Sequence, residues 1–98
     1  MAGDFDLKGK VAIVTGASRG LGQYFSRALA RAGANVVITS RTPESLEQTR
    51  KDIEAMGRKA LACALDTRKV ETIQPMVDAA LRQFGRIDVL VNNAGCNI

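Results

Sequence analysis

Four short apolar segments alternate along the chain with three longer amphipathic ones. The apolar segments lie at about 11–14, 35–39, 60–65 and 87–91. Polar residues hardly interrupt them, which is typical of strands buried on both faces of a parallel sheet. The intervening segments, at about 20–31, 42–56 and 70–84, repeat apolar residues at helical spacing. The pattern therefore predicts the order β-α-β-α-β-α-β.

The predicted helices carry apolar stripes that we expect to face the sheet. The first stripe comprises Leu21, Tyr24, Phe25, Ala28, Leu29 and Ala32, and the third helix has Val70, Ile73, Val77, Leu81 and Phe84. Tyr24, the only tyrosine of the chain, is interpreted as a packing residue because it lies within its stripe. The second helix is predicted to begin at Thr42 and Pro43, a capping hydroxyl followed by proline at the first helical position.

Alternating strands and helices with short turns imply right-handed crossovers and one parallel sheet. We therefore expect an α/β fold of the Rossmann type, with a doubly wound sheet. A chain of 98 residues allows at most one small domain. Residues 1–98 are interpreted as the N-terminal, dinucleotide-binding part of such a domain.

The turn after the first predicted strand, residues 15–22, is rich in glycine. Gly16 is expected to form the tight turn, Gly20 to admit phosphate groups, and Gly22 to let the helix pack closely on the strand. The helix N-terminus beyond the turn offers free N–H groups to a diphosphate. The spacing G-x-x-x-G-x-G matches neither the P-loop nor the G-x-G-x-x-G fingerprint, which would need a glycine at Phe25. A glycine-rich turn without a ligand is the alternative interpretation.

Polar residues also follow the other three strands, where ligands bind in open parallel sheets. They are Ser40 and Arg41 after the second strand, Asp66 after the third, and Asn92 to Gly95 after the fourth. An acid at the end of the second strand would select NAD by binding the ribose 2′-hydroxyl. Arg41 stands near that place, and Arg19 lies in the glycine turn. This favours a 2′-phosphate, hence NADP over NAD. The alternative for Arg41 is that it is an ordinary surface arginine in contact with solvent. Asp66 either accepts a hydrogen bond from the adenine amino group or caps the next turn.

Composition and charge exclude several other classes of protein. The net charge is +4, but basic residues are mixed with acidic ones and only 4% of residues are aromatic, so no nucleic-acid platform is predicted. No apolar run approaches the roughly 20 residues needed to cross a membrane. The N-terminus carries two acids in residues 1–6 and does not look like a secretory signal. We therefore expect a cytoplasmic protein.

Histidine is absent from the sequence, and no metal-ligand spacing is present. Neither a metal site nor a Ser/His/Asp nucleophile is expected. The two cysteines are expected to be reduced in the cytoplasm, with Cys63 in the core and Cys96 nearer the surface.

The glycine turn, together with Asn92-Asn93-Ala94-Gly95, resembles the short-chain dehydrogenase/reductase family, and the resemblance extends from about Leu7 to Gly95. With the residues at the strand ends, it gives as candidate cofactor-binding residues Gly16, Ser18, Arg19, Gly20, Leu21, Gly22, Ser40, Arg41, Asp66, Asn93, Ala94 and Gly95. The resemblance implies that Arg41 selects NADP, that Asp66 lies near the adenine ring, and that residues 93–95 stabilise the central strand and line the adenosine ribose.

One position departs from the family pattern. The family usually places a hydroxyl two residues after the aspartate, and this chain has Arg68 there. Either Thr67 caps the following helix instead, or that helix begins less cleanly.

The resemblance also implies what this chain lacks. The family uses a catalytic serine, a Y-x-x-x-K pair and an upstream asparagine, whereas Tyr24 is followed four residues later by Ala28. No catalytic residue is therefore assigned, and these 98 residues are expected to be inactive alone. The parent is expected to be a longer NADP-dependent oxidoreductase, a homo-oligomer, that transfers hydride between nicotinamide and a small carbonyl or alcohol substrate. The chain also stops at the exposed side of the fourth strand. A sheet that ended there would leave an apolar edge prone to aggregation, so we expect the sheet to continue.

The sequence leaves open both the substrate and the class of protein. The ends of the chain look similar to sugar-acid dehydrogenases such as gluconate 5-dehydrogenase, and a 3-ketoacyl carrier-protein reductase is equally compatible. A non-catalytic nucleotide-binding or interaction module is the second interpretation. A flavodoxin-like signalling domain is disfavoured, because Gly16 and Ala17 occupy the place where it needs an acidic pair.

Overall fold

The computed structural model describes residues 6–93, which form a four-stranded parallel sheet. The strands are β1 (Val11–Thr15), β2 (Asn35–Ser40), β3 (Ala60–Ala64) and β4 (Val89–Asn92). Their order is β3-β2-β1-β4, so that β1 pairs with both β2 and β4. The chain winds outward in one direction from β1 to β3 and then crosses back to β4. The turn after β1 therefore lies at the point where the strand order reverses, which is where open α/β sheets bind ligands.

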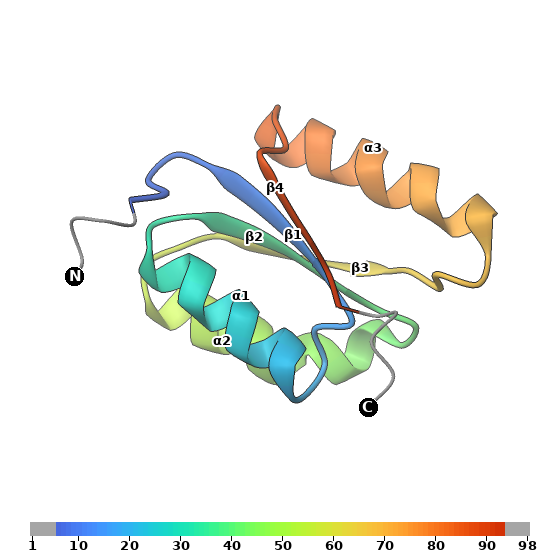
Figure 1. The fold of residues 1–98 in the computed structure, drawn as a ribbon, viewed down its shortest axis with the longest axis horizontal. Helices are drawn as coiled ribbons and strands as arrows, with labels where there is room; N and C mark the ends of the chain where they lie inside the picture. The colour runs from blue at the N-terminus through green and yellow to red at the C-terminus, as the bar shows by residue number, and fades with distance from the viewer. Residues whose placement is uncertain (1–5, 94–98) are drawn as a thin grey trace.

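Helices cover both faces of the sheet (Figure 1). Helices α1 (Leu21–Arg31) and α2 (Glu47–Ala55) lie on one face, and α3 (Ile73–Phe84) lies on the other. A short 3₁₀ turn precedes each of the last two, η2 (Pro43–Leu46) before α2 and η3 (Val70–Thr72) before α3. This arrangement confirms the predicted doubly wound, Rossmann-type α/β fold. Within residues 6–93, every helix is too short or too polar to reach across a bilayer.

The central strands are buried on both faces, as their continuous apolar sequence predicts. Val14, Val36 and Ile38 pack against α1 and α2, in a cluster that includes Leu46 and Ile53. On the other face, β1 and β2 contribute the second cluster, which packs against α3. Its members are Val11, Ile13, Val37, Leu65, Met76 and Ala80. Cys63 is half-buried at the margin of this second cluster, so its predicted core position is only partly realised, and Cys96 lies outside the described residues.

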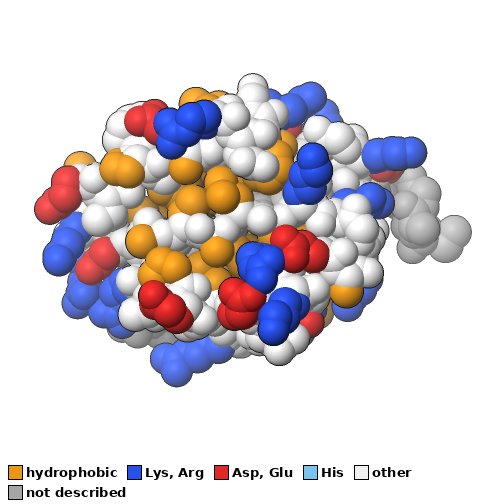
Figure 2. All heavy atoms as spheres, turned by 180° about the vertical axis from the view of Figure 1, so that it is seen from behind, with side chains coloured by type: hydrophobic (Ala, Val, Ile, Leu, Met, Phe, Trp, Pro, Cys, Tyr) orange, Lys and Arg blue, Asp and Glu red, His pale blue; other side chains and the backbone are white. Residues whose placement is uncertain are grey.

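The two edge strands are less covered. Seen from behind, a band of apolar surface runs between the two helical layers, with charged side chains bordering it (Figure 2). The edge strand on that side is β3, whose residues are only half-buried apart from the exposed Ala64. At the opposite edge, Leu90 of β4 is 63% exposed.

The predicted stripe of α1 was partly wrong. Leu21 and Tyr24 are 50% and 60% exposed, whereas the fully buried side of the helix carries Gly22, Ser26 and Ala30. The reason is the close approach of α1 to the glycine turn. A Cβ on Gly22 would lie only 1.9 Å from the carbonyl oxygen of Gly16. Small residues therefore face the sheet, and the large apolar ones are turned to the side.

The predicted stripe of α3 was also shifted. Val70, Ile73 and Leu81 are exposed, and Met76 and Ala80 take the buried positions. Val77 and Phe84 are partly buried against the same cluster, as predicted. The segment at residue 70 forms the η3 turn rather than the helix proper, so its side chains do not follow the helical spacing.

Candidate functional site

The carboxyl ends of the four strands meet at one edge of the sheet and bring the candidate residues to the same side of the molecule. Gly16, Ser18, Arg19 and Gly20 lie in the turn after β1, and Leu21 and Gly22 open α1. Ser40 ends β2 and is followed by Arg41, and Asp66 lies two residues beyond β3. Asn93 follows β4, whereas Ala94 and Gly95 lie outside the described residues.

The backbone of the glycine turn adopts conformations that favour glycine. Gly16 and Gly20 adopt φ values of +67° and +60°, which side chains disfavour. A Cβ on Gly20 would meet nothing within 4 Å, so the backbone there borders open space. A Cβ on Gly22 would instead strike the carbonyl group of Gly16. The geometry fits a tight turn at Gly16 and close packing at Gly22, and the phosphate role of Gly20 stays a prediction.

Helix α1 begins at this turn without a side-chain cap. Gly20 is the N-cap residue, no side chain of residues 6–93 caps this helix start, and no acidic residue lies in the first turn. The first N–H groups of a helix have no partner within the helix, and they carry the positive end of its dipole. The residues present therefore fit a diphosphate, which would accept from the backbone at this helix start.

Asn93 and Thr15 tie the glycine turn to β4. The side-chain Nδ2 of Asn93 donates to the carbonyl oxygen of Gly16 over 3.0 Å, and the backbone N–H of Asn93 donates to Thr15 Oγ1 over 2.9 Å. Thr15 Oγ1 also lies 3.1 Å from Asn92 Oδ1, to which it donates. Thr15 was not among the predicted site residues, although its position as the last residue of β1 before Gly16 was the available signal.

A second set of contacts ties the turn to β2 and α2. The backbone N–H of Ala17 donates to the carbonyl oxygen of Thr39 over 2.9 Å, and the buried Thr49 hydroxyl donates to the carbonyl oxygen of Ala17 over 3.1 Å. Thr49 was not predicted, because nothing in the periodicity marks a hydroxyl that reaches a distant carbonyl. Thr39 was not predicted either, because it takes part through its backbone carbonyl. With β4 on one side and α2 on the other, the turn is held in shape before any ligand arrives.

Ser40 organises the loop that carries Arg41. Its side chain is buried, and its hydroxyl contacts the carbonyl oxygen of Thr42 at 2.6 Å, the N–H of Thr42 at 3.2 Å and the hydroxyl of Ser45 at 3.0 Å. The predicted side-chain cap by Thr42 does not form, since its hydroxyl donates to Ser45 Oγ instead. Ser40 therefore acts on the loop through its hydroxyl.

Arg19 and Arg41 are exposed at neighbouring strand ends. Neither guanidinium has a hydrogen bond or ion pair with any other residue of the range 6–93. The bond between Ala17 and Thr39 places the glycine turn beside the end of β2, where Arg41 follows. Two unpaired guanidinium groups at this edge suit a phosphate ester, for which arginine is the preferred partner.

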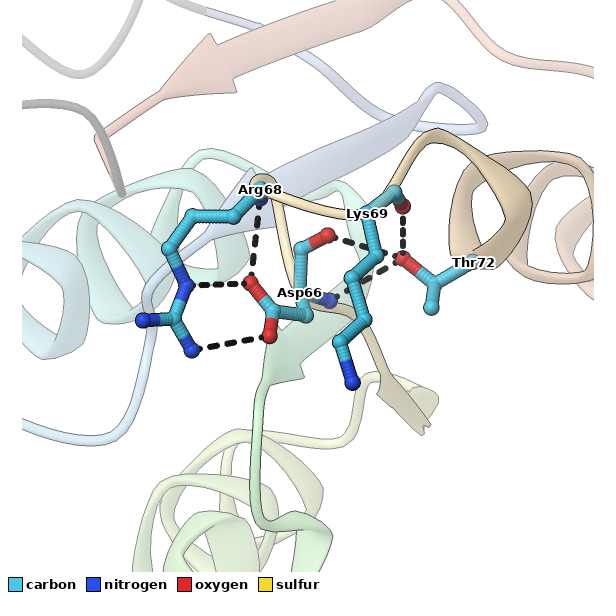
Figure 3. Close-up of polar contacts among 4 residues, drawn as sticks. All are labelled: Asp66, Arg68, Lys69 and Thr72. Carbon is cyan, nitrogen blue, oxygen red and sulfur yellow. Dashed lines mark hydrogen bonds and ion pairs between the residues drawn. The ribbon is translucent and has the colours of Figure 1, made fainter.

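Asp66 is engaged by Arg68 in a two-point contact (Figure 3). Arg68 donates from Nε to Oδ1 and from Nη2 to Oδ2, each over 3.0 Å, and its backbone N–H donates to Oδ1 over 3.0 Å. Hydrogen bonds from the Arg68 side chain, foremost among the causes, lower the pKa of Asp66 to about 2. The carboxylate is therefore charged at neutral pH.

The following helix begins less cleanly, as one of the two alternatives at Arg68 predicted. Neither η3 nor α3 has a side-chain cap, and Thr67 does not supply one. Thr72 instead closes the loop, with its hydroxyl accepting from the N–H of Asp66 over 3.1 Å (Figure 3). Residues 6–93 hold no cluster of three or more side chains of the kinds that bind metal ions.

The sequence matches a known family over nearly its whole length. A model of the short chain dehydrogenase family matches residues 10–98. The ketoacyl reductase HetN of Nostoc sp. is 47% identical over 92 residues, which is 94% of this chain and 32% of that protein. The 2-dehydro-3-deoxy-D-gluconate 5-dehydrogenase of Escherichia coli is 46% identical over 94 residues, which cover 93% of this chain and 35% of that protein. The chain thus spans about a third of the length of these curated relatives.

Solved structures share the fold. A Sinorhizobium meliloti protein described as a short-chain alcohol dehydrogenase superposes with a TM-score of 0.90 at 52% identity, over 96% of this chain and 37% of that one. A metagenomic short-chain oxidoreductase in complex with NADP gives a TM-score of 0.85 at 44% identity, over 92% and 41%. A short chain dehydrogenase from Mycobacterium paratuberculosis bound to NAD gives 0.87 at 30% identity, over 94% and 39%. The sequence and the fold agree, and the chain belongs to the short-chain dehydrogenase family.

Proposed function

We propose that this chain is the NADP-binding part of a longer oxidoreductase that transfers hydride between nicotinamide and a carbonyl or secondary alcohol. The observation that carries the proposal is the uncapped start of α1 at Gly20, with Arg19 and Arg41 unpaired among the described residues beside it. When bound, the dinucleotide supplies the hydride donor or acceptor. The residues of this chain bind and orient it.

Each part of the site has a role in that binding. The glycine turn and the first N–H groups of α1 hold the diphosphate. Arg41 and Arg19 pair with the 2′-phosphate, and Asp66 accepts from the adenine amino group. Asn93 keeps the turn in shape through its bond to Gly16, and we propose that Ala94 and Gly95 line the ribose next to it.

The preference for NADP is part of the proposal, because one similar structure holds NADP and another holds NAD. Ser40 is the last residue of β2, so no carboxylate stands there to accept from a free 2′-hydroxyl. The positive charge of Arg41 in the next position supports a phosphate at that place.

A longer domain is supported by the apolar surface around β4. Leu90 is largely exposed on one face of the strand. On the other face, an apolar groove of about 320 Å³ lies beside Val91 and is lined by α1 residues, Phe25, Ala28 and Leu29 among them. Further strands and helices packed there would complete the sheet and supply the catalytic residues.

We propose a small-molecule substrate of sugar-acid or 3-ketoacyl type, a cytoplasmic location and a homo-oligomer. The names of the two relatives support the substrate classes. A non-catalytic nucleotide-binding module is the second candidate, because no catalytic residue is assigned among residues 6–93.

The charge at position 41 tests the cofactor assignment. In the full-length protein, Arg41→Asp should weaken NADPH binding by about 30-fold or more and NADH binding by about threefold or less, since a charge-assisted contact to the extra phosphate is lost. Arg82→Asp makes the same charge change on α3, away from the site, and should alter neither affinity by more than about twofold. Equal losses of both cofactors in Arg41→Asp would remove Arg41 as the phosphate ligand. Binding of both cofactors without turnover of any carbonyl substrate would favour the second candidate.

A further inference from the structure

The loop after β3 places an acidic and a basic side chain edge to edge where we propose that adenine binds. Arg68 holds Asp66 through Nε and Nη2, each over 3.0 Å (Figure 3). The side chain of Asp66 is only 15% exposed, and that of Arg68 is 69% exposed. The pair is therefore fixed on its acidic side and open to an incoming ring on its basic side.

Counting donors and acceptors shows what the pair leaves unused. A carboxylate has about four acceptor positions, and a guanidinium has five N–H donors. Arg68 fills both positions of Oδ1 and one of Oδ2, using two guanidinium donors and its backbone N–H. Within residues 6–93, one acceptor position on Oδ2 thus remains next to an unused N–H on Nη2. The outer edge of the pair offers an acceptor beside a donor.

This combination differs from a lone carboxylate in what it can recognise. A purine with a 6-amino group presents a donor beside a ring acceptor. A 6-oxo purine presents the reverse, an acceptor beside a ring N–H. A lone carboxylate only accepts, so it favours the 6-amino ring and repels a 6-oxygen. The Asp66–Arg68 edge can match either ring.

We propose that Arg68 is a specificity-determining residue that relaxes discrimination at the purine 6-position of the bound dinucleotide. This inference rests on the proposed function, in which Asp66 faces the adenine ring. Arg68 offsets the charge that would repel a 6-oxygen and supplies the N–H that would bind it. The Asp66 carboxylate still accepts from a 6-amino group.

The test compares the dissociation constants of NADPH and of its 6-oxo analogue, in which hypoxanthine replaces adenine. Both are measured by titration of the full-length protein. Arg68→Ser should raise the ratio of 6-oxo to 6-amino dissociation constants by about 3- to 10-fold, chiefly by weakening the 6-oxo analogue. Arg68→Lys keeps the charge but loses the planar fork, so its ratio should lie between those of the wild type and Arg68→Ser.

Arg86 provides a matched control. It holds Asp88 through Nε and Nη2, each over 2.8 Å, at the amino end of β4 and thus at the opposite end of the sheet. Arg86→Ser breaks the same kind of pair and should leave the ratio unchanged. As a second variant of the site, Asp66→Asn replaces the carboxylate with an amide that can donate or accept, so its ratio should stay near one.

The outcomes separate this inference from the proposed function. An unchanged ratio in Arg68→Ser, or equal weakening of both ligands, would overturn it and leave Arg68 as a support of the loop. If Arg68→Ser does not fold, a wild-type ratio above about 10 overturns it equally well, because relaxed discrimination requires a ratio near one. Failure of the wild-type protein to bind either dinucleotide would overturn the proposed function, and the inference with it.

Discussion

The side-chain amide of Asn93 donates to the carbonyl oxygen of Gly16 over 3.0 Å, so the end of β4 holds the turn that follows β1. The same residue donates through its backbone N–H to Thr15 Oγ1. Gly16 takes part through its backbone carbonyl, and Thr15 takes part through its hydroxyl. The shape of the turn therefore depends on a residue from a neighbouring strand.

Asn93→Ala should weaken both the fold and cofactor binding. Loss of the bond to Gly16 is expected to cost about 1 kcal/mol of unfolding free energy, measured by urea denaturation. NADPH affinity should fall by about 3- to 10-fold, because the turn is no longer held in its binding shape.

Asn35→Ala is the matched control for Asn93→Ala. Asn35 Oδ1 accepts from the N–H of Lys59 over 2.9 Å at the amino end of β2, far from the glycine turn. Its loss should cost a similar amount of stability, about 1 kcal/mol, and leave NADPH affinity unchanged. If both variants lose affinity equally, Asn93 has no particular role in the site.

Gly22→Ala should be severely destabilising. The new Cβ would lie 1.9 Å from the Gly16 carbonyl oxygen and 2.9 Å from the Cα of Ala17, both of them backbone atoms that cannot move aside alone. Overpacking of this kind is expected to cost about 2–3 kcal/mol or more, seen as a lower midpoint of thermal unfolding, and to abolish NADPH binding.

Gly57→Ala separates crowding from backbone strain. Gly57 has φ +81°, but a Cβ there would meet nothing within 4 Å. The substitution should cost about 1 kcal/mol, from the left-handed conformation alone, without affecting NADPH. A Gly22→Ala protein as stable as the Gly57→Ala protein would show that α1 can move away from the turn.

Asp66 should make stability depend on pH in the acid range. Its pKa is lowered from 3.8 to about 2, chiefly by the Arg68 side chain. A group whose pKa is lower in the folded state stabilises the fold at pH values above its unfolded pKa. This stabilisation is lost as the pH falls through the folded pKa. The stability measured in urea should therefore fall between about pH 4 and pH 2. The stability of the Asp66→Asn protein should fall less steeply over the same range.

Asp88 contributes in the same direction, because Arg86 lowers its pKa as well. Asp66→Asn should therefore reduce the pH dependence without removing it. A pH dependence as steep in Asp66→Asn as in the wild type would mean that the Arg68 contact does not persist in solution.

The strands and helices could be predicted because their signals are local and repeated. Apolar runs marked β1 to β4 to within one or two residues, and the polar residues at the strand ends marked the edge where the candidate site lies. Periodicity alone misplaced Tyr24. Which side of a helix faces a sheet depends on how close the helix comes, and Gly22 sets that distance.

The contacts that hold the site could not be predicted in the same way. Thr49 reaches Ala17 across 32 positions, and no local pattern marks such a hydroxyl. The pair of Asp66 and Arg68 depends on side-chain rotamers, so the sequence showed only an unusual residue at position 68.

The bond between Asn93 and Gly16 spans 77 positions, and this sets an order of events during synthesis. The glycine turn is among the first segments made, yet it can be locked only after β4 has left the ribosome and paired with β1. Contacts this distant in sequence form late, because a large loop must close first. We therefore expect a nascent chain to gain affinity for a dinucleotide abruptly when residue 93 emerges. Cofactor binding would then report that β4 has paired with β1.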